Sequence, residues 1–241
     1  MNFLLTTIIT HLLAAAMILI APWLGHLQYQ RARKRLQAGA SKVKVRLYRN
    51  VVVEQIVVTA TVCGLWLFGG VPRANLGICA PRPWWLTVAL GTMLAGFLVR
   101  SGLRARPKAQ ELRASLDGKL GVLLPDTKDE HRWFVAVSVG AGISEELAYR
   151  GFLFYYFSLL LPWLNSIEVV LLTSVVFGMG HLYQGWRGIL KTGIGGLILA
   201  GLYLLSGSLL LPMLVHAAMD LQVPFIFWPQ AGPLDVAQEA A

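Results

Sequence analysis

The sequence predicts an all-α protein: a polytopic membrane bundle of about seven transmembrane helices, with a range of six to eight. Three observations lead to this fold class. Of the 241 residues, 56% are hydrophobic and only 14% are charged, whereas a soluble domain is nearer a quarter charged. Several apolar runs reach the roughly 20 residues that a membrane-spanning helix needs. The basic residues gather in a few connecting segments instead of spreading along the chain.

The apolar runs locate the expected spans. They fall at about 3–24, 50–71, 84–100, 132–161, 166–183, 188–206 and 208–224. The first run lacks the basic flank of a signal peptide, so we expect it to be a retained span. The fourth run is long for a single span, so we expect it to be tilted, to begin at the interface, or to kink near Gly151.

Leucines recur at helical spacing between the third and fourth runs. Leu112, Leu116, Leu120 and Leu123 alternate there with basic residues, and this pattern predicts one amphipathic helix at the cytoplasmic interface. A loop helix packed on the bundle fits the same pattern, so both interpretations stay open.

Two connecting segments carry most of the positive charge. Residues 31–50 hold eight of the 21 Lys and Arg residues, and residues 100–132 hold another eight. Basic residues favour the cytoplasmic side of a membrane, and alternating loops satisfy that rule with the N-terminus outside and the C-terminus in the cytoplasm. The net charge of +9 is therefore explained by topology. We expect contact with the lipid bilayer and no binding of nucleic acid, since no recognised nucleic-acid-binding fold accompanies the charge.

The stretch "GISEELAYRGF" puts three charged residues inside the fourth apolar run. An ionisable residue at membrane depth costs about 2.5–3.5 kcal/mol on insertion scales, which makes it a functional candidate. Glu146 and Arg150 are four positions apart with the acid first, which favours an ion pair on one helix face. Glu145 has Tyr149 at the same spacing instead of a base, so it is left available as a general base. An ion pair that only fixes helix packing is the alternative.

Two later runs carry histidines with the same four-residue spacing. Phe177 and His181 end the fifth run, where Gly178 and Gly180 permit close helix approach. Taken alone, such a histidine is more often a satisfied polar residue than a catalyst. The seventh run contains "PMLVHAAMD", in which a carboxylate one turn away can hold an imidazole in position. That His–Asp pair could bind metal, stabilise an oxyanion, or simply satisfy itself.

Taken together, three of these fragments resemble the motifs of one family. "EELAYR", "FGMGH" and "HAAMD" fit E-E-x-x-x-R, F-x-x-x-H and H-x-x-x-N/D, in order and over roughly residues 130–224. These are motifs of the CAAX-protease and bacteriocin-processing group of intramembrane proteases, called CPBP or Abi. The resemblance implies an all-α bundle with a conical cavity that opens to the cytosol. It divides the chain into N-terminal spans with basic loops and an interfacial helix (1–131), a CPBP-type catalytic core (132–228) and a cytoplasmic tail (229–241).

The resemblance also implies a role for the residues of the first two motifs. Glu145 and His181 would activate a water molecule for hydrolysis, and Glu146 and Arg150 would support them. Phe177 would contribute packing within its motif. In the third motif, the resemblance implies an oxyanion site at His216 and Asp220. An ionised aspartate cannot donate a hydrogen bond, so we expect Asp220 to orient His216.

The sequence places the two expected catalytic residues at different depths in the membrane. Glu145 lies 13 positions after Arg132, roughly 20 Å along a helix, whereas His181 lies near the cytoplasmic end of its span. They can meet only if the fourth span starts outside the hydrocarbon or the fifth continues towards Trp186.

These inferences predict an intramembrane endopeptidase that uses a water molecule activated by Glu and His. Its partner would be a membrane-anchored or lipidated protein or peptide, and it would lie in a bacterial inner or plasma membrane as a multi-pass protein. No cofactor or metal is expected.

Three other functions remain open from the sequence. A zinc-dependent membrane peptidase could use Glu145, His181 and His216 as ligands with one open position, although the sequence has no H-E-x-x-H motif. A membrane scaffold or immunity protein would pair the polar cluster internally. A transporter with an acid relay is the third, although no repeat-related broken helices are evident.

Overall fold

The structure is a computed structural model, and it describes residues 3–69, 76–116 and 120–228. All regular elements within these residues are helical. In chain order they are α1 (Phe3–Ala15), η1 (Ala16–Ile20), α2 (Ala21–Gln37), α3 (Val43–Gly69), α4 (Trp84–Ala105), η3 (Arg106–Lys108), α5 (Ala109–Ser115), η4 (Gly121–Leu123), α6 (Lys128–Glu146), η5 (Leu147–Leu153), α7 (Phe154–Leu160), α8 (Ser166–Gly180), η6 (Leu182–Gln184), α9 (Trp186–Ser206) and α10 (Leu210–Ile226). The expected tail, 229–241, lies outside the described residues.

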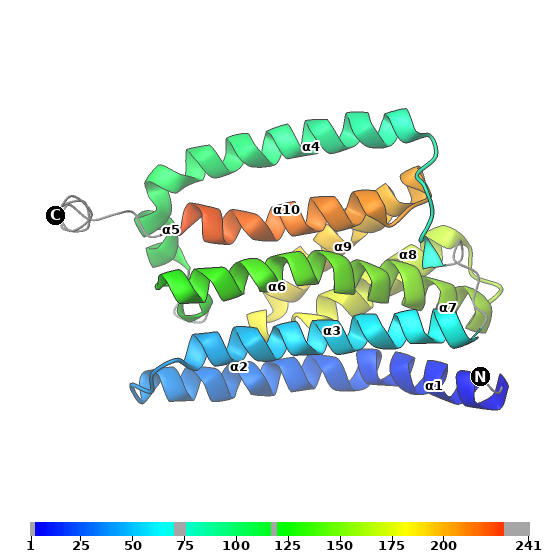
Figure 1. Ribbon diagram of the computed structural model, residues 1–241, viewed down its shortest axis with the longest axis horizontal. Coiled ribbons are helices and arrows are strands. Elements are labelled where there is room, and N and C mark those ends of the chain that lie inside the picture. The colour runs from blue at the N-terminus through cyan, green and yellow to red at the C-terminus, as the bar shows by residue number, and fades with distance from the viewer. Residues whose placement is uncertain (1–2, 70–75, 117–119, 229–241) are drawn as a thin grey trace.

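Each expected span corresponds to one helical rod in the described part of the chain. The elements α1, η1 and α2 run on as one rod, and so do α6, η5 and α7 (Figure 1). Among the residues that the structure describes, four segments are long and apolar enough to cross a membrane: Leu4–Gln37, Val43–Gly69, Trp84–Ser115 and Trp186–Ser206. The helices α8 and α10 are shorter and apolar. The all-α membrane bundle is thus confirmed, whereas the number of spans and the division into domains stay predictions.

The helix α6 lies at the centre of the bundle. It packs against α3 on one side and α10 on the other, while α8 and α9 pack against each other. The rod of α1 and α2 lies beyond α3, and α4 lies beyond α10 (Figure 1). The helices that carry the first and third motifs, α6 and α10, therefore pack directly against each other, and α8, which carries the second, packs against α9.

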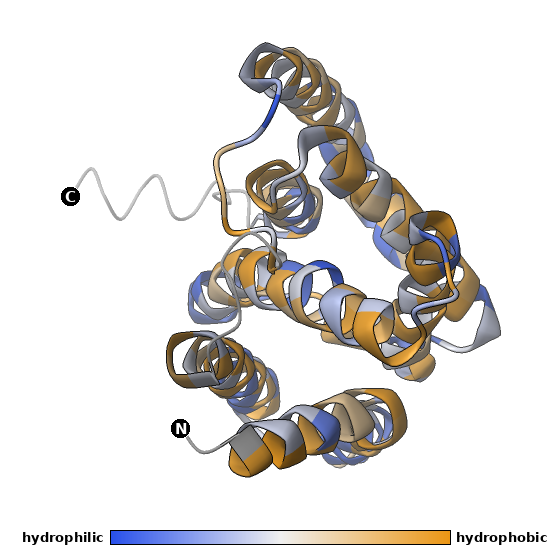
Figure 2. Ribbon diagram, turned by 90° about the vertical axis from the view of Figure 1, so that its right-hand side faces the viewer, coloured by the Kyte–Doolittle hydropathy of each residue, from blue (hydrophilic) through white to orange (hydrophobic). Residues whose placement is uncertain are grey.

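Large apolar side chains cover the outside of the bundle. Trp23, Leu67, Phe97 and Val175 each have more than half of their surface exposed, and hydrophobic residues predominate along the helices (Figure 2). Exposed apolar surface on this scale marks contact with a membrane or partner. The distribution agrees with helices whose outer faces meet lipid.

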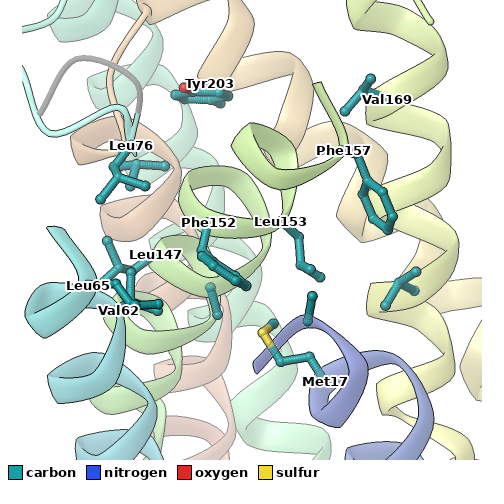
Figure 3. Close-up of a cluster of buried hydrophobic side chains, with 14 residues drawn as sticks. Met17, Val62, Leu65, Leu76, Leu147, Phe152, Leu153, Phe157, Val169 and Tyr203 are labelled. Atoms are coloured by element: carbon teal, nitrogen blue, oxygen red, sulfur yellow. The ribbon is translucent and has the colours of Figure 1, made fainter. Parts of the chain in front are cut away.

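A buried hydrophobic cluster surrounds the irregular part of the fourth rod. Leu147, Phe152 and Leu153 of the π-helix η5 pack there with Val62 and Leu65 of α3 (Figure 3). A π-helical turn widens the backbone and rotates the residues that follow, and such turns recur at functional sites. The departure from a regular helix that we expect near position 151 takes this form.

The helix expected over the leucine pattern is shorter than the sequence suggested. The helix α5 ends at Ser115, and Leu116 has extended backbone with ψ of 107°. Further along, the Tyr48 hydroxyl donates to the carbonyl of Leu123 at 2.6 Å, and the Lys44 ammonium donates to that of Leu124 at 2.7 Å. The segment is therefore tied to α3, as in the packed-loop interpretation. The glycine-containing run "LDGKLG" explains the break, because glycine weakens helices.

Candidate active site

Arg150 is the most connected side chain of the polar cluster. Its Nη1 donates to Oε1 of Glu146 at 2.8 Å, and its Nη2 donates to the carbonyl of Gly196 on α9 at 2.9 Å. Its guanidinium carbon lies 4.4 Å from the centre of the Phe177 ring, a cation–π distance. The Arg150 and Glu146 side chains are 1% and 0% exposed. The ion pair expected from the four-residue spacing is present, and it is fully buried.

Gly196 lets α9 approach this cluster, and sequence reasoning did not single it out. A Cβ at this position would lie 3.0 Å from the Phe177 ring and 3.3 Å from Nη2 of Arg150. A side chain here would therefore push α9 away and remove the carbonyl that Arg150 uses. The glycines of the run "GIGG" at 193–196 were the available signal, because small residues allow close helix packing.

His216 is held by Glu146, not by Asp220 as expected. Its Nδ1 lies 2.7 Å from Oε1 of Glu146, and since a carboxylate oxygen accepts, Nδ1 donates. Its Nε2 lies 3.8 Å from Oδ2 of Asp220 and 3.9 Å from Oε2 of Glu145. Both distances are too long for a direct hydrogen bond. The fixed nitrogen of the ring therefore faces Glu146, and its other nitrogen faces two carboxylates.

The two adjacent glutamates have different surroundings. Both oxygens of Glu146 are buried, and one of them accepts from both Arg150 and His216. The side chain of Glu145 is 28% exposed, and its buried Oε2 has no hydrogen-bond partner. One carboxylate is thus fixed by two bases, while the other reaches the edge of the cluster without a hydrogen bond to its buried oxygen.

His181 follows directly after the last residue of α8. Its Nδ1 lies 3.0 Å from the carbonyl oxygen of Phe177, so Nδ1 donates, and in the neutral form of the ring Nε2 is then the nitrogen that can accept. The Phe177 ring lies between the two histidines, with ring centroids 5.1 Å from His181 and 5.9 Å from His216. It also contacts Tyr149 edge-on at 5.0 Å. The phenylalanine of the second motif therefore separates and positions both imidazoles.

The helix lengths explain how Glu145 and His181 come to the same depth. Glu145 precedes the last residue of α7, Leu160, by 15 positions, and His181 follows the first residue of α8, Ser166, by 15. Both side chains thus lie about 22 Å from the turn that joins the two helices. The fourth rod begins at Lys128, 17 positions before Glu145, whereas α8 ends at Gly180 without continuing towards α9.

Close helix contacts set the distance between α6 and α10. A Cβ on Gly142 would lie 2.7 Å from the Cβ of Ala217 and 2.8 Å from the carbonyl oxygen of Met213. On the other side of the cluster, a Cβ on Gly178 would lie 2.7 Å from the carbonyl oxygen of Ile189. Gly178, noted in the second motif, therefore does permit tight packing, and the contact between Gly142 and Ala217 brings His216 to Glu146.

Two tyrosines beside the cluster carry no sequence motif. The Tyr183 ring in η6 lies 6.0 Å from the His181 ring, and Tyr29 of α2 lies 5.9 Å from Tyr183, both measured between centroids. Through this contact α2 reaches the cluster from outside the region of the motifs. Tyrosines in such positions look like any others in the sequence, so no pattern could have selected them.

Two cavities lined by described residues lie elsewhere than the conical cavity that the resemblance implies. The first has a volume of about 340 Å³ and lies along α4 and α5, and the second, which is smaller, lies between α1, α3 and η5. Within residues 3–69, 76–116 and 120–228, no group of three or more His, Cys, Asp or Glu is arranged to hold a metal ion.

The comparison with family models gives a match over residues 129–222, to the family described as type II CAAX prenyl endopeptidase Rce1-like. This segment is similar to that family. The resemblance to the CPBP group is thereby confirmed. The comparison with curated proteins found no match, and neither did the comparison with solved structures.

The Rce1-like segment contains every residue of the three motifs and ends within α10. The family supports CAAX-type intramembrane protease activity in general. Together with the apolar helices, it indicates an integral membrane protein whose substrates are membrane-associated proteins or peptides.

Proposed function

We propose that this protein is an intramembrane endopeptidase that hydrolyses a peptide bond in a membrane-anchored or lipidated protein or peptide. One observation carries the proposal. An unpaired carboxylate, Glu145, lies beside an imidazole, His216, whose far nitrogen is fixed by a second, fully buried carboxylate. A free base next to a positioned donor is what hydrolysis through an activated water requires.

Glu145 is the proposed general base, assisted by His181. The carboxylate removes a proton from water, and the resulting hydroxide attacks the carbonyl carbon of the scissile peptide. The tetrahedral intermediate then collapses with cleavage of the C–N bond, and the proton passes from Glu145 to the leaving amine. The bare Nε2 of His181 accepts a second hydrogen bond from the water and so orients it.

His216 is the proposed donor to the oxyanion. Glu146 holds Nδ1, so the ring presents Nε2 towards the region beside Glu145. As an imidazolium it donates from both nitrogens, and a donor that is fixed beforehand needs no reorganisation as negative charge develops. Asp220, at 3.8 Å from Nε2, balances the charge of this ring instead of contacting the oxyanion.

We also propose that the N-terminus lies outside and the C-terminus in the cytoplasm of a bacterial membrane. The two basic segments lie at the same end of the bundle, because Lys44 at the start of α3 bonds to Leu124 and Asp126 before α6. Segments rich in Lys and Arg favour the cytoplasmic face.

Hydrolysis is proposed to proceed without a metal. In the set Glu145, His181 and His216 that could bind zinc, each histidine already commits its Nδ1 to a protein oxygen. The test is metal analysis of the purified protein together with cleavage after chelation. Full activity without bound metal would support the proposal, and activity that returns only with zinc would establish the zinc peptidase instead.

The central experiment compares wild-type protein with Glu145→Gln. Substrates are first identified by mass spectrometry after capture on a Glu145→Ala variant, and their cleavage is then measured in vesicles. We expect the glutamine variant to fold normally and to cleave at least about 100-fold more slowly, because general-base catalysis contributes roughly that much or more. Normal cleavage by a folded Glu145→Gln variant would refute Glu145 as the general base, whereas the absence of cleavage by wild-type protein would refute the protease and leave the scaffold or immunity protein.

A further inference from the structure

A groove beside the end of α4 is separate from the candidate active site. It has a volume of about 340 Å³ and is lined by three cations, Arg100, Arg104 and Lys108, with Phe97 and Leu112 at its apolar parts. The volume falls in the range of small-ligand sites, roughly 300–1,000 Å³. No residue of α6 or α8 contributes to its lining.

The three cations repeat every four positions, so they form one stripe along α4 and into η3. The short helix α5 lies below the end of α4 (Figure 1), and its residue Leu112 is part of the lining. Neighbouring arginines have partners: Arg106 lies over the Phe225 ring, and Arg113 pairs with Asp126. Among the described residues, no ion pair is formed by the three cations of the groove.

The position of the groove along α4 fits the level of lipid headgroups. Trp84 and Trp85 at the other end of the helix are largely exposed, and tryptophans mark membrane interfaces. Arg104 follows Trp84 by 20 positions, or about 30 Å of helix, which equals the usual hydrocarbon thickness. Phe97, one turn before Arg100, then lies on the acyl-chain side of the groove.

We propose that this groove binds the headgroup of an anionic phospholipid. The cations pair with the phosphate and the charged headgroup, and Ser101, which also lines the groove, supplies a hydroxyl donor. The apolar end at Phe97 contacts the start of an acyl chain. A basic pocket on the face of a membrane protein that meets the interface has this chemistry. A soluble anion would match the cations but would gain nothing from the apolar end.

The test uses the full chain in nanodiscs and measures lipid that stays bound after transfer to detergent, by native mass spectrometry. The groove variant replaces Arg100, Arg104 and Lys108 by Gln. The matched control replaces three basic residues of α2 at the same end of the bundle, Arg31, Lys34 and Arg35, which are exposed.

We expect wild-type protein to retain phosphatidylglycerol over phosphatidylcholine. The groove variant should retain at least about tenfold less phosphatidylglycerol, since each basic residue at an anionic surface contributes to the binding free energy. The control should change the retained amount by less than about twofold. Equal loss in both variants, or equal retention of phosphatidylcholine, would overturn the proposal. Displacement of phosphatidylglycerol by millimolar inorganic phosphate would overturn it in favour of a free-anion site.

A further variant keeps every charge. Ala105→Trp places a large ring in the groove, because Ala105 is part of its lining. We expect retention of phosphatidylglycerol to fall as in the glutamine variant. Unchanged retention in a protein that elutes and melts like wild type would show that lipid is attracted by surface charge alone, which contradicts a bound headgroup.

Discussion

Oε1 of Glu146 lies 2.7 Å from Nδ1 of His216, although the two residues are 70 positions apart in the chain. The same oxygen lies 2.8 Å from Nη1 of Arg150. The central carboxylate of the cluster therefore joins α6 to α10 and to the π-helical turn at once. A residue expected to support the catalytic glutamate is also the one that fixes the proposed oxyanion donor.

Replacing Glu146 by Gln should destabilise the protein far more than replacing Glu145. Loss of the Glu146 charge leaves Arg150 buried without its counter-ion, and breaking a buried pair in this way costs about 3–5 kcal/mol. Glu145 has no such partner, so Glu145→Gln should melt close to wild type. Thermal unfolding of both variants in the same detergent measures the difference. Similar losses in the two variants would contradict the unequal roles of the glutamates.

Arg150→Lys should also be destabilising, although it keeps the charge. A single ammonium cannot reproduce the planar fork that donates to both Glu146 and the carbonyl of Gly196. We expect a loss of about 1–3 kcal/mol from the buried acceptor left unsatisfied. The control is Arg187→Lys, where the guanidinium lies over the exposed ring of Trp186. Equal melting temperatures for Arg150→Lys and wild type would show that charge alone is needed.

The sequence predicted contacts within a helix better than contacts between helices. The pairing of Glu146 with Arg150 follows from helical periodicity, so spacing alone was enough. The hydrogen bond from His216 to Glu146 depends on how closely α6 and α10 pack, which no spacing expresses. For that reason the expected partner of His216 was Asp220, its nearest carboxylate along the same helix.

The depth of the site also needed the structure. From the sequence, the apolar run of the fifth span extends to 183, but the helix itself ends at Gly180. His181 therefore follows the helix directly, and it reaches the level of Glu145 because both residues lie 15 positions from the turn between α7 and α8. Helix ends depend on local caps and on packing as well as on apolar character. The same limitation made the leucine pattern after α4 suggest a longer helix than α5.

Gly142→Ala should weaken catalysis by separating two helices. The added Cβ would meet Ala217 at 2.7 Å, so α6 and α10 must move apart and the hydrogen bond between Glu146 and His216 lengthens. Overpacking of this kind costs about 1–3 kcal/mol. Gly64→Ala in α3 is the matched control, because a Cβ there meets nothing within 4 Å. It should be neutral or stabilising by up to about 1 kcal/mol. Equal cleavage rates for both variants would show that this helix contact does not position the site.

Asp126 should make the stability of the protein depend on pH in the acid range. Burial alone would raise the pKa of this carboxyl, but hydrogen bonds from Lys44 and Arg113 outweigh it and hold the pKa below the ordinary value of 3.8. A carboxyl whose pKa is lower in the folded state stabilises fully above its unfolded pKa. The stabilisation is then lost as the pH falls through the lower, folded value. Melting temperatures measured from pH 6 down to about pH 3 should therefore decline less steeply below about pH 4 for Asp126→Asn than for wild type.

The exposed neighbour Asp129, replaced by Asn, serves as control and should keep the wild-type slope. An Asp126→Asn profile parallel to that of wild type would show that the contacts of Asp126 with Lys44 and Arg113 do not stabilise the fold.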